Sequence, residues 1–178
     1  MHDIIRGNTT IIEGIEPLCA HGGSVRHTSD SFGNAYHWFQ LDTPHQLLQA
    51  ADILHSQGSR LAMITAYNRH SDAGPMQALC YQFVLEGVVY SVTVPLDAEW
   101  PQVPSITPLF NNADWHEREM MELYGIKIVN QPNPRRLFLD EELDKGLLGE
   151  LVPLSIMMNG ASSQDLWERI LQGKESRS

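Results

Sequence analysis

The residues best suited to chemistry lie between positions 115 and 122, in the run WHEREMME. Two of its three glutamates could act as general acid and general base, or His116 and Glu119 could ligate a metal one helical turn apart. Neither pattern is specific, because Met120 fills the second histidine position of an HExxH zinc motif. A small stand-alone metal-assisted hydrolase using these carboxylates is therefore one alternative, and a free-standing binding module is another.

Glu117 needs a partner if the run is helical. It projects close to the middle of the apolar helix face, where an unpaired carboxylate is strongly destabilising. We expect it to lie at the rim or to accept hydrogen bonds or an arginine, with Arg135 and Arg136 as the obvious candidates. Three charged residues spaced four apart on the opposite side are expected to form a solvated stripe: Asp114, Arg118 and Glu122.

Several function classes find no support in the sequence. It contains no dinucleotide-binding glycine motif, no Walker loop and no serine elbow, and the two cysteines, Cys19 and Cys80, stand alone. With 22 acidic against 12 basic residues the net charge is -10, which opposes binding of nucleic acid. No apolar run is long enough for a membrane span or a secretory signal, so we expect a cytoplasmic location.

Two helices are well marked. Thr43, Pro44 and Gln46 have the types and spacing of a capping box, and an apolar stripe follows them as far as Gly58. The second predicted helix covers residues 113–124, with Asn111 placed to cap it and Gly125 to end it.

Strands are predicted at residues 35–41, 61–67, 79–85 and 88–94, with a two-residue turn at Glu86 and Gly87 between the last two. Residues 24–34 and 68–77 are expected to be loops, and four prolines, Pro95, Pro101, Pro104 and Pro108, are expected to exclude regular structure there.

The fold class is therefore α+β: a mixed, largely antiparallel sheet of about four strands, two main helices and a short C-terminal helix at residues 164–171. We divide the chain into a poorly assigned N-terminal segment (1–34), an α+β domain (35–139) and a C-terminal extension (140–178).

The stretch from Pro101 to Leu139 carries a family pattern. Pro-Ser-Ile-Thr at 104–107, Ala-Asp-Trp at 113–115 and Glu-Arg-Glu at 117–119 precede an aromatic-Gly pair, a proline and two arginines. This order resembles the C-type subunit of NADH:quinone oxidoreductase, respiratory complex I, and its counterparts in membrane-bound energy-converting nickel-iron hydrogenases and formate hydrogenlyase. The resemblance implies an interface or structural motif made of Trp115, Glu117, Arg118, Glu119, Glu122, Tyr124, Gly125, Pro132, Arg135 and Arg136.

Some positions differ from the complex I pattern. Glu122 replaces the usual Asp, Gln131 stands where a His is common, and the family's Arg-Lys-Asp-Phe-Pro-Leu stretch is missing. The run NPRRLFL at 133–139 is closer to the hydrogenase branch.

The resemblance also implies a role. The chain is expected to be a non-catalytic hydrophilic subunit with no cofactor of its own, scaffolding a large hydrogenase-like or quinone-binding subunit. Iron-sulfur clusters, nickel-iron or quinone are expected in partner subunits. The chain would be peripheral on the cytoplasmic face and reach the membrane only through those partners.

Overall fold

The computed structural model describes residues 7–19, 25–71, 74–97 and 99–138. Their elements are helices α1 (Thr9–Ile15), α2 (Leu47–Ser56) and α3 (Ala113–Leu123), strands β1 (Val25–Ser29), β2 (Ala35–Gln40), β3 (Arg60–Ser71), β4 (Gly74–Leu85), β5 (Val88–Pro95), β6 (Gln102–Pro104) and β7 (Lys127–Val129), and the 3-10 turns Glu16–Leu18 and Pro44–Gln46.

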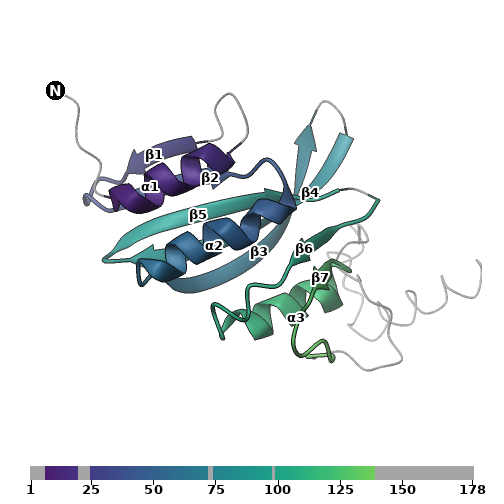
Figure 1. Ribbon diagram of the computed structural model, residues 1–178. Helices are drawn as coiled ribbons and strands as arrows, with labels where there is room; N and C mark the ends of the chain where they lie inside the picture. Colours follow the sequence, from purple (N-terminus) through teal and green to yellow (C-terminus); the bar gives the residue numbers. More distant parts are fainter. Residues whose placement is uncertain (1–6, 20–24, 72–73, 98, 139–178) are drawn as a thin grey trace, which may run out of the picture.

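The main sheet has the strand order β1-β2-β5-β4-β3, in which only β2 and β5 run parallel. Figure 1 shows α1 and α2 lying across one face of this sheet and α3 beyond its β3 side, next to β6 and β7. The apolar sides of the helices and the alternating inward residues of the strands form one buried core. The α+β prediction is confirmed, with five strands in the main sheet and a separate two-stranded sheet.

Elements that the sequence marks with capping or turn residues are found where they were predicted. The Thr43 N–H donates to Gln46 Oε1 at 2.9 Å, as a capping box requires, and α2 follows. Glu86 and Gly87 both have positive φ, 50° and 80°, which matches the twist of a tight hairpin between β4 and β5. These predictions are confirmed.

The expected loop at residues 68–77 is wrong. Pairing of β3 with β4 continues from Arg60 opposite Val84 to Ser71 opposite Gly74. Pro75 is tolerated because β5 reaches only to Ala78, so the proline lies beyond the part of β4 that is paired on both sides.

Three strands were not predicted: β1, β6 and β7. β1 occupies residues expected to be a loop, and it pairs antiparallel with β2 from Val25 opposite Phe39 to Ser29 opposite Ala35. β6 lies among the prolines, where Val103 pairs parallel with Ile128 of β7. The prediction of irregular structure fails there because β6 needs only three extended residues, and a proline, Pro104, is tolerated as its last residue.

The N-terminal residues belong to the same core as the sheet. Ile11 and Ile15 of α1 are fully buried in it. The Asn8 N–H donates to the Tyr90 hydroxyl at 2.7 Å, and the Tyr90 ring stacks on buried His37 with centroids 5.2 Å apart. The helix predicted at 164–171 and the rest of the C-terminal extension lie outside the described residues.

Candidate functional site: a charged clamp on α3

Helix α3 begins at the predicted residue and ends one residue earlier than predicted, at Leu123, but its start is held by other groups than expected. Asn112, not Asn111, occupies the N-cap position, and neither side chain caps the helix: the Asp114 N–H bonds to the Asn111 carbonyl. The Asn112 side chain instead donates to the Leu61 carbonyl at 2.9 Å, which ties the helix to β3. Gly125 has φ 68° directly after the helix, so the predicted glycine end is confirmed.

Glu117 is 1% exposed, and its carboxylate is held by the segment that follows β6. It accepts hydrogen bonds from the Ser105 hydroxyl at 2.6 Å, the Ile106 N–H at 2.7 Å and the Thr107 hydroxyl at 2.9 Å. The expectation that Glu117 accepts hydrogen bonds is therefore confirmed, whereas the alternatives of a rim position and of an arginine partner are wrong. The three donors are consecutive residues, because the segment that follows β6 lies directly against α3.

Burial raises the pKa of the Glu117 carboxyl above its ordinary value of 4.5, although the hydrogen bonds from Ser105, Ile106 and Thr107 lower it. The pKa of the Tyr81 phenol is raised well above 10, first by burial and then by the charge of Glu117. Glu117 is therefore a buried carboxyl next to the core, stabilised by fixed donors rather than by a counter-charge.

Arg118 and Glu122 bind the backbone of the segment after β7. Arg118 Nε donates to the Arg135 carbonyl at 2.9 Å and Nη2 donates to the Arg136 carbonyl at 2.6 Å. Glu122 Oε2 accepts the N–H groups of Leu137 and Phe138, both at 3.0 Å. We call Arg118, Glu122 and the backbone of 135–138 the α3 clamp.

The segment after β7 also contacts the first turn of α3, at Asp114. The Gln131 side chain donates to Asp114 Oδ1 at 3.2 Å, and Arg118 Nη1 lies 3.4 Å from Asp114 Oδ2. Residues 131–138 therefore run along α3 from its first turn to its last. The predicted solvated stripe is wrong, because this segment leaves Arg118 8% and Glu122 2% exposed.

The remaining motif residues lie at or near the surface. Trp115 is 63% exposed, Glu119, Tyr124 and Arg136 are half-buried, and Pro132 and Arg135 are exposed. Sequence reasoning missed Ser105 and Thr107 as donors to Glu117. The Pro-Ser-Ile-Thr run carried that signal, since serine and threonine hydroxyls after a strand commonly bind nearby polar groups.

Two general properties hold for the part of the chain that the structure describes. Within it, no group of three or more His, Cys, Asp or Glu residues is placed to hold a metal ion. None of its helices is long and apolar enough to cross a membrane.

Comparison with known families shows to which family the chain belongs. The family model described as respiratory-chain NADH dehydrogenase, 30 Kd subunit, matches residues 42–163, which is more than half of the chain. The chain belongs to this 30 kDa subunit family. The match contains α2, the sheet from β3 to β5 and the whole α3 clamp.

Curated relatives of the 30 kDa family match over a short stretch. A probable NADH-ubiquinone oxidoreductase 30.4 kDa subunit of Candida maltosa is 50% identical over 42 residues, which cover 24% of this chain and 15% of the relative. An NADH-quinone oxidoreductase subunit of Rhizobium etli (strain CIAT 652) is 44% identical over 41 residues, covering 23% and 22%. The aligned stretch thus spans less than a quarter of these relatives.

A solved structure shares the fold of this family member. A chain of the membrane-bound sulfane sulfur reductase, an archaeal respiratory membrane complex, superposes with a TM-score of 0.55 at 13% identity, covering 74% of this chain and 78% of the other. At that identity the likeness concerns the fold alone.

Proposed function

We propose that the chain is a non-catalytic hydrophilic subunit of a membrane-associated electron-transfer complex, and that it scaffolds the large subunit of that complex. The complex is of the NADH:quinone oxidoreductase type or of the energy-converting nickel-iron hydrogenase type. Membership of the 30 kDa family supports this assignment, as do relatives that are named subunits of NADH-quinone oxidoreductases.

One observation carries the proposal: the charged side chains of α3 bind the protein's own backbone. Arg118 and Glu122 hold residues 135–138, and Glu117 holds residues 105–107. A general acid or base needs access to a substrate proton, whereas the oxygens of these two buried glutamates accept hydrogen bonds from fixed donors of the chain. The clamp fixes the shape of one surface, which is the task of a scaffold.

The proposed role locates the redox chemistry elsewhere. Iron-sulfur clusters and the nickel-iron or quinone site belong to partner subunits, and this chain contacts the membrane only through them, as a peripheral subunit on the cytoplasmic face. The large hydrogenase-like or quinone-binding subunit is the partner that the scaffold positions.

A native pull-down tests the proposal. The tagged full-length chain is recovered from its own host after mild detergent extraction, and co-purifying proteins are identified by mass spectrometry. Recovery of a quinone-binding or hydrogenase-like large subunit supports the scaffold role and distinguishes the two types. Recovery of the chain alone, or of stoichiometric flavin, iron or nickel bound to the isolated chain, contradicts it.

A further inference from the structure

The α3 clamp leaves two side chains of its segment exposed. Arg118 and Glu122 bind the backbone of 135–138, while the Arg135 side chain is exposed and Phe138 is 64% exposed. Trp115, 63% exposed, lies on the same stripe of α3, since residues at i, i+3 and i+7 share one side of a helix with Arg118 and Glu122. Two aromatic rings and one guanidinium thus project beside a rigid support.

Residues 131–138 run along α3, so Arg135 lies by Arg118 and Phe138 lies by Glu122, on the stripe that begins with Trp115. Glu122 lies seven positions after Trp115 on the helix, a rise of roughly 10 Å. Binding energy at protein interfaces concentrates in small clusters of Trp, Tyr and Arg of this extent, and a preorganised cluster loses little conformational entropy on binding. We call Trp115, Arg135 and Phe138 the α3 surface.

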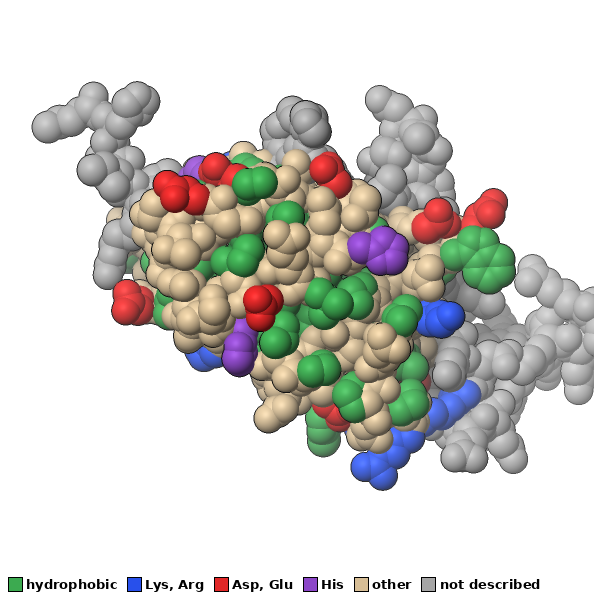
Figure 2. All heavy atoms as spheres, in the orientation of Figure 1, with side chains coloured by type: hydrophobic (Ala, Val, Ile, Leu, Met, Phe, Trp, Pro, Cys, Tyr) green, Lys and Arg blue, Asp and Glu red, His purple; other side chains and the backbone are tan. Residues whose placement is uncertain are grey.

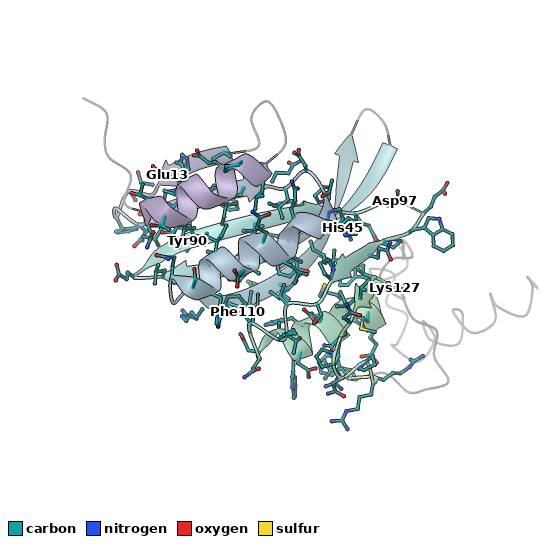
Figure 3. All side chains as sticks on the ribbon, viewed as in Figure 1. Glu13, His45, Tyr90, Asp97, Phe110 and Lys127 are labelled. Carbon is teal, nitrogen blue, oxygen red and sulfur yellow. The ribbon has the colours of Figure 1, made fainter. Side chains whose placement is uncertain are left out.

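The segment that follows α3 is basic, unlike the elements before it. Residues 123–138 contain Lys127, Arg135 and Arg136 and no acidic residue, whereas residues 7–100 contain many acidic residues and three arginines. Helix α3 itself carries four acidic residues, of which Glu117 and Glu122 are buried. Figure 2 shows the largest group of Lys and Arg side chains at the lower right, beside α3 and β7. Figure 3 places Lys127 beside α3 and far from Glu13 on α1.

We propose that the α3 surface docks a protein subunit whose facing surface combines Asp or Glu residues with apolar pockets for Trp115 and Phe138. This inference rests on the proposed function and adds the chemistry of the partner. Arg135 would pair with a partner carboxylate, for which the guanidinium fork is suited. A nucleic acid or an anionic lipid surface fits less well, because the two large rings need shaped apolar pockets.

Co-purification of variant full-length chains with the native complex tests the surface. Trp115→Ala and Phe138→Ala are each expected to lower the apparent affinity for the complex about tenfold at any ionic strength. Arg135→Glu is expected to lower it by a similar factor at low ionic strength, with a smaller difference in high salt. Phe32→Ala and Arg60→Glu are matched controls, because both side chains are exposed on other parts of the molecule, and they are expected to bind as the wild type does.

Photo-crosslinking identifies what lies against the surface. With benzoyl-phenylalanine at position 115, the expected adduct is a partner-protein peptide that contains Asp or Glu, and position 32 should not give it. An adduct with residues 139–178 of this chain, with lipid or with a second copy overturns the proposal, as does unchanged affinity of all three variants. If the three variants bind normally and the wild type still recovers the complex, the docking role of the α3 surface is wrong while the proposed function is retained. If the wild type recovers no complex, the proposed function itself is wrong.

Discussion

Arg118 and Glu122, one turn apart on α3, hold opposite polar groups of the same short segment: the guanidinium binds the carbonyls of Arg135 and Arg136, and the carboxylate binds the N–H groups of Leu137 and Phe138. A segment that forms neither a helix nor a strand there thus has its backbone hydrogen bonds satisfied by side chains. The conformation of residues 135–138 therefore depends on the buried side chains of Arg118 and Glu122, and we expect substitution of either residue to lower the free energy of unfolding.

Arg118→Met should therefore destabilise the full-length protein by roughly 2–3 kcal/mol, because two carbonyls lose charged donors in a buried setting. Urea unfolding followed by circular dichroism measures the difference. Arg135→Met is the matched control, since Arg135 contributes its carbonyl to the clamp and its side chain is exposed. The control is expected to change stability by less than about 0.5 kcal/mol. Equal effects of the two substitutions would contradict the clamp.

Gly125→Ala should cost about 1 kcal/mol, because φ 68° at this position is unfavourable for a residue with a Cβ. Gly125→Asn should cost less, since asparagine tolerates this conformation better than alanine. Thermal unfolding of the three proteins gives the order. The interpretation of Gly125 as the helix end is wrong if alanine and asparagine are equivalent.

Elements with strong local signals could be predicted from the sequence. The capping box before α2, the Glu86-Gly87 turn and the glycine after α3 each specify backbone geometry through one or two residues. β1 was missed because Val-Arg-His-Thr-Ser is mostly polar and gains its structure from pairing with β2. β6 was missed because its partner, β7, follows more than twenty residues later, on the other side of α3.

The candidate site could be predicted only in outline. The sequence indicated that Glu117 needs a partner, but it could not show which one, because the donors are hydroxyls and a backbone N–H. Arg118 was expected to be solvated because its hydrogen-bond acceptors are backbone carbonyls. Every residue has a backbone carbonyl, so the amino-acid sequence does not show which of them will accept from Arg118.

Cys19 should react slowly with iodoacetamide in the folded protein. Burial is the main cause that raises its pKa to about 11, and the thiol lies 3.4 Å from the Ile15 carbonyl, to which it donates. At pH 8 about one thiol in a thousand is then ionised, and the thiolate is the reactive form. Mass spectrometry of labelled peptides should show rapid labelling in urea and little without it. Equal rates in both conditions would show that Cys19 is accessible in the folded state.

Glu117→Gln should destabilise the protein, and the loss should grow as the pH falls from 7 toward 4.5. Burial raises the pKa of Glu117 in the folded state above its unfolded value of 4.5. Between these two values the folded state binds more protons than the unfolded state, so the wild type gains stability from this group as the pH falls, and glutamine cannot. The other carboxyls are common to both proteins and cancel in the difference.

Urea unfolding of both proteins at several pH values measures this dependence. Ser105→Ala is a companion variant: it removes the 2.6 Å donor while leaving the carboxyl able to titrate, so its stability loss should shrink as the pH falls and the carboxylate is neutralised. Opposite trends for Glu117→Gln and Ser105→Ala would identify Glu117 as the titrating group. A difference from wild type that does not change with pH in either variant would mean that the pKa of Glu117 is not raised by folding.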